Sequence, residues 1–160
     1  MKRLFLSSVF LTIVALAFAQ ESAMPPKDLS GFSGYAWGTS IDFISSTMEA
    51  EKYELISSGH KDLWYRGEIL REPMELVYYF ENSMLISGMW IFDDADEDTF
   101  WHVNNFLRDE YNSDASLKIR GELFIESEMQ PFGADAWIIH ELDIEADRHV
   151  VHYYYQRGAE

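Results

Sequence analysis

The chain has 160 residues, 28 of them acidic and 12 basic, and its formal net charge is −16 at pH 7. Because such a surface repels phosphate backbones and anionic membranes, we do not expect nucleic acid as a partner, whereas a cationic partner fits. The chain has no cysteine, which excludes a disulfide framework and a lipid-linked cysteine, so we expect one domain stabilised by its hydrophobic core.

Residues 1–19 predict a signal peptide. Lys2 and Arg3 give a positively charged start, residues 4–16 are mostly apolar, and residues 17–19 (Ala-Phe-Ala) fit the small-x-small cleavage pattern. The apolar run is shorter than the roughly 20 residues that a membrane-spanning helix needs. We therefore expect cleavage, no stable membrane anchor, and a periplasmic or secreted protein.

Residues 20–31 contain two adjacent prolines and little apolar periodicity, which predicts a flexible linker. A single folded domain is then predicted at residues 32–160. Its first helix is expected from about Ile41, because Ile41, Ile44 and Met48 recur at helical spacing. Thr39 precedes Asp42 by the spacing of a capping box, so we predict Thr39 as the cap and an end before residue 53.

Residues 53–92 are short runs rich in aromatic and branched side chains, separated by glycine and proline, which predict three or four antiparallel strands. The clearest signal is a hairpin of residues 74–80 and 85–92, because the segment between them contains Asn and Ser. Alternate residues of a strand share one face. In the first hairpin strand we expect the core set to be Met74, Leu76, Tyr78 and Phe80.

A second helix is predicted at residues 99–111, where apolar residues again recur at helical spacing, with Asp98 or Thr99 as its cap. Further strands are expected at residues 117–127, 137–144 and 149–156. The predicted fold class is therefore α+β, an antiparallel β-sheet with two helices packed on one face. Because a helix followed by about three strands occurs twice, we also advance the hypothesis of a duplicated unit, with repeats at residues 32–93 and 94–160.

The acidic run from Asp93 to Asp98 raises the hypothesis of a calcium site, because Asp94, Asp96 and Asp98 have the spacing with which a calcium loop begins. Counted from Asp94, however, the glycine and glutamate positions of such a loop hold Thr99 and Asn105. We favour a solvated connector whose carboxylates face a helix N-terminus. A calcium-dependent module remains an alternative.

No catalytic residue and no cofactor site are predicted. The five histidines include no pair at the spacing of a helical zinc motif, and no serine lies in a Gly-x-Ser-x-Gly elbow. His149 and His152 would point to opposite faces of a strand. A small exported hydrolase-type enzyme remains the second alternative.

Aromatic side chains on the predicted strands give the strongest functional signal. These side chains cluster at residues 64–65, 78–80 and 153–155 and at Trp90. Because neighbouring residues of a strand face opposite sides of the sheet, rings are expected on both faces. Exposed tyrosine and tryptophan anchor protein and peptide partners. We therefore predict a non-catalytic binding module, with the candidate partner-binding residues Trp64, Tyr79, Trp90 and Tyr154.

Residues 34–41 (Gly-Tyr-Ala-Trp-Gly-Thr-Ser-Ile), the strand at Trp64 and Tyr65, and the hairpin at residues 79–82 resemble small bacterial periplasmic proteins with a Trp-Gly-Thr-Ser helix start. More distantly, the order of helix and meander resembles the SmpA/OmlA-type outer-membrane assembly lipoproteins and the β-lactamase inhibitor proteins. The latter resemblance implies two such units with a concave, aromatic-rich binding sheet. The assembly lipoproteins have a lipidated cysteine and the inhibitor proteins have disulfides, whereas this chain has no cysteine. The resemblance therefore implies an architecture and no binding residue.

Overall fold

The computed structural model describes residues 29–51, 53–121, 124–131 and 135–155. The predicted signal peptide, residues 1–19, lies outside these ranges, as does most of the predicted linker, residues 20–31. Leu29, near the end of that linker, is only 3 % exposed, so packed structure includes residues before residue 32. Within the described part of the chain, no helix has the length and apolar character needed to cross a membrane.

The described residues form two helices, a small sheet and a large one. The first half contains β1 (Gly31–Phe32), β2 (Tyr35–Ala36), α2 (Ile41–Ala50), β3 (Glu54–Ser58), β4 (Asp62–Ile69), β5 (Glu72–Glu81) and β6 (Met84–Phe92). The second half contains α3 (Glu97–Tyr111), β7 (Ser116–Arg120), β8 (Phe124–Met129), β9 (Ala136–Asp143) and β10 (Arg148–Tyr155). Strands β1 and β2 pair with each other, and the other eight form one antiparallel sheet. The predicted α+β class is confirmed.

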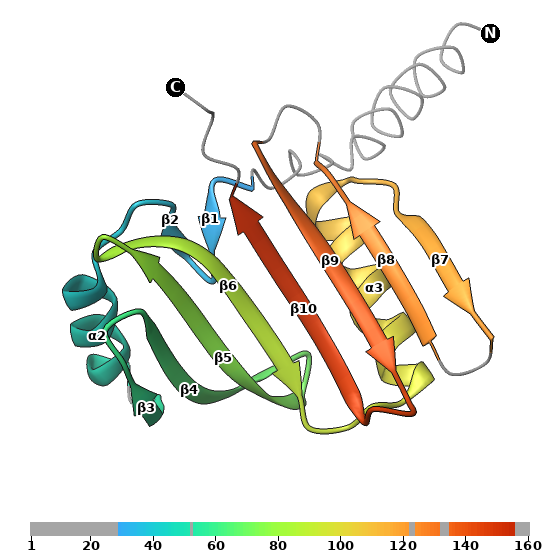
Figure 1. Ribbon diagram of the computed structural model, residues 1–160, viewed down its shortest axis with the longest axis horizontal. Helices are drawn as coiled ribbons and strands as arrows, with labels where there is room; N and C mark the ends of the chain where they lie inside the picture. Colours follow the sequence, from blue (N-terminus) through green and yellow to red (C-terminus); the bar gives the residue numbers. More distant parts are fainter. Residues whose placement is uncertain (1–28, 52, 122–123, 132–134, 156–160) are drawn as a thin grey trace, which may run out of the picture.

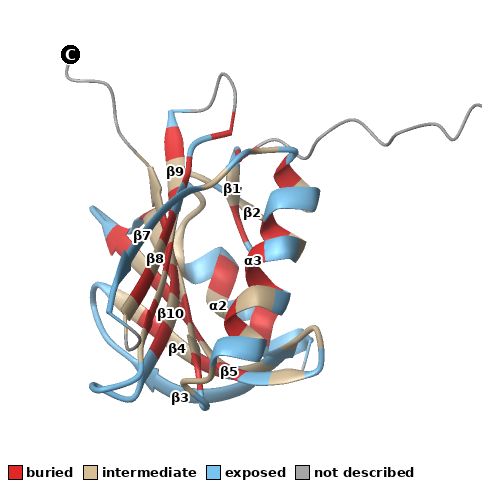
Figure 2. Ribbon diagram, turned by 90° about the vertical axis from the view of Figure 1, so that its right-hand side faces the viewer, coloured by how far each residue is buried: buried red, intermediate tan, exposed pale blue. Residues whose placement is uncertain are grey.

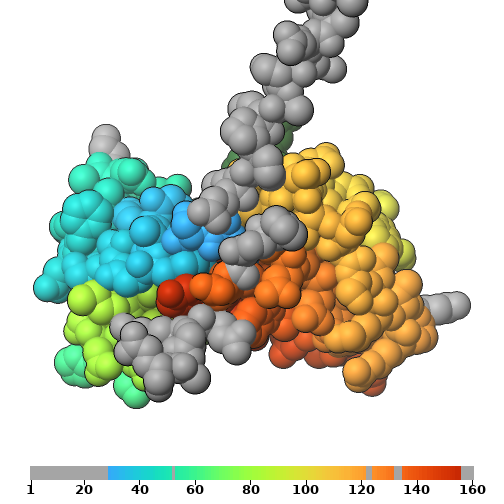
Figure 3. All heavy atoms as spheres, turned by 90° about the horizontal axis from the view of Figure 1, so that it is seen from above, coloured from blue at the N-terminus to red at the C-terminus, as the bar shows by residue number. Residues whose placement is uncertain are grey.

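One helix followed by four antiparallel strands occurs in both halves of the chain. The large sheet has the order β3-β4-β5-β6-β10-β9-β8-β7, so each half forms a meander that runs from an edge to the centre. Because β6 and β10 pair antiparallel, an approximate two-fold axis through this pair relates the two meanders. Figures 1 and 3 show the first half, blue to green, beside the second, yellow to red.

Both helices lie on the same side of the large sheet (Figure 2). Ile44 and Met48 of α2 share one buried cluster with Val103, Leu107 and Tyr111 of α3. The sheet contributes to that cluster the four side chains predicted as core, Met74, Leu76, Tyr78 and Phe80. We call this side of the sheet the covered face and the opposite side the open face.

The β1–β2 arm adds a ring to the covered face. Phe32 lies over Gly88, where any side chain would overlap its ring. Its ring contacts Tyr78 at a centroid distance of 5.3 Å and Tyr153 at 4.9 Å. The missing side chain at Gly88 therefore makes room for an aromatic cluster between the two halves.

The cap of α2 is Ser40, so the prediction of Thr39 was wrong. Ser40 Oγ accepts a hydrogen bond from the backbone N–H of Phe43 at 3.4 Å. Thr39 instead donates its hydroxyl to the carbonyl of Ala36 at 2.7 Å, and its own carbonyl accepts from the backbone N–H of Leu85 at 2.9 Å. Pairing with the start of β6 fixes the chain at Thr39 and moves the helix start forward by one residue.

The cap of α3 is Asp96, not Asp98 or Thr99 as predicted. Its Oδ1 atom accepts from the backbone N–H of Thr99 at 2.9 Å, so the helix begins at Glu97. Hydrogen bonds to Thr99 lower the pKa of Asp96. The carboxylate therefore stays charged at the positive end of the helix dipole.

The strand predictions hold except at one place. The hairpin of β5 and β6 is confirmed, and its turn residues Asn82 and Ser83 both have positive φ, as a type I′ hairpin turn requires. The predicted single strand at residues 117–127 is wrong, because β7 ends at Arg120 and β8 begins at Phe124. Gly121, with φ of 67°, allows the chain to reverse there.

Candidate functional site

Cross-strand pairing aligns the side chains of the open face in rows that cross five adjacent strands, β4, β5, β6, β10 and β9. The first row consists of Asp62, Tyr79, Ser87, Tyr154 and Trp137. The second row consists of Trp64, Val77, Met89, His152 and Ile139. Ile91 and Val150 pair in a third row. Strands distant in sequence thus contribute apolar and aromatic groups to one surface.

Most of these side chains are only half-buried, because neither helix lies over this side of the sheet (Figure 2). We define the open-face strip as the half-buried apolar and aromatic members of the three rows. They are Trp64, Tyr79, Met89, Ile91, Trp137, Ile139, Val150, His152 and Tyr154.

Ring contacts hold the aromatic members of the open-face strip in place. Trp137 stacks on Tyr154 with a centroid distance of 5.6 Å and an interplanar angle of 24°. The ring centroid of His152 lies 3.7 Å from the ring centroid of Tyr154 and 6.2 Å from that of Tyr79. Because the rings already support one another, little rotamer freedom remains to be lost when a partner binds.

A hollow of about 380 Å³ lies within the open-face strip. Its apolar lining comes from β6, β9 and β10 and includes Met89, Ile139 and Val150, beside the rings of His152 and Tyr154. Glu141 and Arg148 also line the hollow, and the two side chains form an ion pair. The hollow is therefore an apolar depression with a charged border.

The tyrosine hydroxyls of the open-face strip remain protonated near neutral pH. Burial raises the pKa of Tyr79, and the nearby carboxylate of Asp62 raises it further. Burial also raises the pKa of Tyr154, with a smaller effect of Tyr79. Trp64 donates its indole N–H to Asp62 Oδ2 at 2.9 Å. The strip therefore offers neutral hydroxyl groups beside its apolar surface.

Of the four predicted partner-binding residues, three lie on the open face and one does not. Trp64, Tyr79 and Tyr154 belong to the open-face strip. Trp90 is only 6 % exposed and lies in the core of the covered face, where its indole N–H donates to Ser33 Oγ at 3.2 Å. Trp90 is therefore no part of the open-face strip.

Sequence reasoning missed Trp137, Ile139 and His152 as members of the same surface. The signal was present, because residues 137–144 and 149–156 were predicted as strands. What was lacking was the order of strands in the sheet, which places β10 between β6 and β9. Only this order brings Trp137 and Tyr79 to the same surface.

Ser87 and His152 form the arrangement on the open face that most resembles a catalytic pair. Ser87 Oγ lies 2.8 Å from His152 Nε2, but it donates its proton to the carbonyl of Tyr153 at 2.9 Å. Burial alone lowers the pKa of His152 to about 4, so no carboxylate contributes to this shift. The serine is not activated by the imidazole in this geometry, and the hydrogen bonds position the histidine ring.

The acidic run places its three candidate metal ligands in different roles. The Asp96 carboxylate caps α3, and Asp94 accepts a hydrogen bond through its backbone carbonyl from His149 Nδ1 at 3.2 Å. Within the ranges described, no three His, Asp or Glu side chains are grouped so that they would hold a metal ion. Asp98 lies in the first turn of α3, so the acidic run leads into the helix, caps it and forms its start.

Two buried histidines, His140 and His149, are in contact on the covered face of the sheet. Because His149 Nδ1 donates to a carbonyl, Nε2 of its neutral ring accepts, and His140 Nε2–H donates to it at 2.8 Å. The pair is stacked between Phe92 and Phe100 at centroid distances of 4.4 Å and 4.1 Å. Burial lowers the pKa of both histidines, so the pair is a neutral core element.

Comparison of the chain with models of known protein families, with curated proteins and with solved structures gave no match. In structural terms the described residues form an α+β domain in which α2 and α3 cover one face of an eight-stranded antiparallel sheet and leave the other face open.

Proposed function

We propose that this protein is a non-catalytic binding module that holds a protein or peptide partner on the open-face strip. The observation that carries the proposal is the run of apolar and aromatic side chains that crosses five strands on the side of the sheet opposite to α2 and α3. Patches of this kind on a protein surface mark interaction sites, and aromatic anchors supply most of the binding energy. On account of the predicted signal peptide, we place the module in the periplasm or outside the cell.

The charges around the open-face strip favour a partner with basic side chains. Three basic side chains on this face are already within ion-pair distance of carboxylates: Lys118 lies 2.7 Å from Glu126, Arg66 lies 3.7 Å from Glu54, and Arg148 pairs with Glu141. Asp62 and Glu75 add further carboxylates to the first and third rows. With a net charge of −16, the protein attracts cations at long range and repels anions.

The resemblance to two-unit inhibitor proteins supports the same proposal, since their sheet is a binding surface. In the present chain the corresponding surface would act through its aromatic groups. The rings of Tyr79 and Tyr154 would take apolar or cationic side chains of the partner, because both kinds of group are attracted to the face of an aromatic ring.

The experiment that tests this function uses a synthetic peptide in which aromatic residues alternate with lysine. Its affinity would be measured by calorimetry for the unchanged protein and for the double variant Trp137→Ser, Tyr154→Ser. We expect a loss of about tenfold or more in affinity, because two anchors of the open-face strip are removed.

The matched control is Phe43→Ser. Phe43 is 59 % exposed and belongs to α2, outside the open-face strip, so its replacement should leave the affinity unchanged. An equal loss in the control and in the double variant would mean that the peptide binds the acidic protein without using the strip, and the proposed function would be abandoned.

A further inference from the structure

Strand β7 forms one edge of the large sheet, and among the described strands its only neighbour is β8 (Figure 1). Such an edge presents unpaired backbone N–H and C=O groups, to which a strand of another chain can add. All five side chains of β7 are exposed. The strand therefore offers a partner both backbone hydrogen bonds and side-chain contacts.

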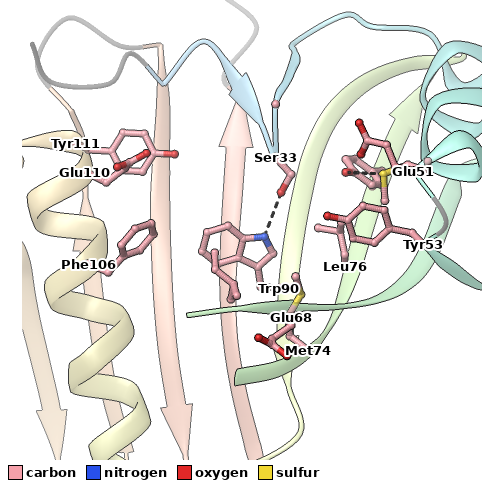
Figure 4. Close-up of a pocket in the computed structure, with 14 residues that line it drawn as sticks. Ser33, Glu51, Tyr53, Glu68, Met74, Leu76, Trp90, Phe106, Glu110 and Tyr111 are labelled. Carbon is pink, nitrogen blue, oxygen red and sulfur yellow. Dashed lines mark hydrogen bonds between the residues drawn. The ribbon is translucent and has the colours of Figure 1, made fainter. Parts of the chain in front are cut away.

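Two apolar side chains of β7 extend the covered face beyond α3. Ile119 pairs with Ile125, which is buried against α3, and Leu117 points to the same side of the sheet. Leu117 and Ile119 are nevertheless 45 % and 60 % exposed. The helix does not cover them, and its Phe106 projects toward Trp90 at the centre of the sheet (Figure 4). A strand added to this edge would bury both side chains, which is favourable.

Residues 114–120 carry charges of both signs, although the chain as a whole is strongly acidic. Lys118 and Arg120 alternate with the two apolar residues and lie on the open face. The guanidinium of Arg120 lies 5.3 Å from the ring centroid of Phe124, which keeps it beside the strand. Asp114 precedes the strand and has a fully exposed side chain, so its contact with Arg108 at 3.7 Å is weak. The segment therefore has a negative charge at one end and positive charges toward the other.

These charges select one pairing between two copies of β7. Two identical antiparallel strands related by a two-fold axis pair about one residue, because opposed side chains share a face, and opposed like charges destabilise the pair. An axis at Lys118 would oppose this lysine with its own copy, and an axis at Ile119 would oppose Lys118 with Arg120. An axis at Leu117 instead opposes Arg120 of each copy with Asp114 of the other.

We propose that this protein forms a homodimer in which two copies of β7 pair antiparallel about Leu117. The two copies of Leu117 then pack on each other, and Ile119 of each copy packs on Ala115 of the other. Two pairs of Arg120 with Asp114 close the ends of the interface. The large sheets are joined edge to edge, with both open faces on the same side.

Sedimentation equilibrium of the purified protein in about 0.15 M salt tests the proposal, because repulsion between the two acidic copies is largely screened at that ionic strength. We expect a reversible equilibrium of monomer and dimer. The backbone amides of residues 116–120 should exchange more slowly with solvent as the protein concentration rises. A protein that stays monomeric up to millimolar concentration, or amide exchange that does not depend on concentration, would overturn the proposal.

A pair of leucine variants locates the interface. Leu117→Lys places two positive charges at the axis and should weaken dimerisation about tenfold or more. The matched control is Leu55→Lys, which changes a leucine of similar exposure, 51 %, in the opposite edge strand β3, and it should leave the dimer unchanged. Equal weakening by the two changes would contradict an interface at β7.

Charge reversal tests the register. Arg120→Glu opposes two carboxylates at each end of the interface and Asp114→Arg opposes two guanidinium groups, so each change should weaken dimerisation about tenfold. The protein that carries both changes regains complementary pairs and should recover the dimer. If it dimerises no better than the single variants, the proposed pairing is wrong. The open-face strip lies on other strands, so the peptide experiment and this one can fail separately.

Discussion

His140 and His149 show how a buried pair of bases makes stability depend on pH. Burial lowers the pKa of each below the ordinary value of 6.5. The unfolded chain therefore takes up protons that the folded chain does not as the pH falls below 6.5. The free energy of unfolding is unaffected by this pair above that pH and decreases below it.

His140→Phe tests this account at the level of one residue. A phenyl ring can still stack on Phe100, but one titrating group is gone. We expect the dependence of the unfolding free energy on pH, measured by urea denaturation at several pH values below neutrality, to become shallower by up to roughly 1.4 kcal/mol per pH unit. Identical slopes for the two proteins would show that His140 does not titrate as the structure implies.

At the scale of elements, the two helix caps decide where each helix begins. Asp96→Ala removes the acceptor for the backbone N–H of Thr99 and should lower the free energy of unfolding by about 1 kcal/mol. Asp96→Asn keeps an acceptor oxygen and should recover most of that loss. Asp98→Ala is the control and should have a small effect, since Asp98 lies within the first turn. If Asp98→Ala costs as much as Asp96→Ala, the assignment of the cap is wrong.

The helices show how far sequence reasoning reaches. The spacing of Ile44 and Met48, and of Val103 and Leu107, was sufficient to predict which side of each helix is buried. The caps were missed because neighbouring residues have side chains equally able to cap. Long-range contacts select among them: for α2, Thr39 is bound to the start of β6.

The position of Trp90 depends on a single irregularity in the β5–β6 hairpin. Near the turn Phe80 pairs with Leu85, but beyond an irregularity at Tyr79 the register shifts by one residue, and Leu76 pairs with Trp90. Such a shift moves side chains to the other face of the sheet. Alternation along the sequence predicts two faces, but it does not reveal the bulge that assigns Trp90 to the covered one.

At the scale of the whole molecule, the α+β class and the repeated order of helix and meander could be predicted because each element has a local pattern. The open-face strip could be predicted only in part. Tyr79 and Tyr154 were found from their aromatic clusters, whereas the contribution of Trp137 depends on the pairing of β6 with β10, which joins the two halves. Contacts between distant strands leave no signal in the spacing of residues along one strand.

The central claim is that the open-face strip binds a peptide partner. Its most direct test follows the indole N–H signals of all five tryptophans by NMR while the synthetic peptide of alternating aromatic residues and lysines is added. The structure places Trp64 and Trp137 on the open face and Trp90 in the core of the covered face. The account predicts that the signals of Trp64 and Trp137 shift together and saturate, while that of Trp90 stays in place. Shifts confined to the tryptophans outside the open-face strip would contradict it.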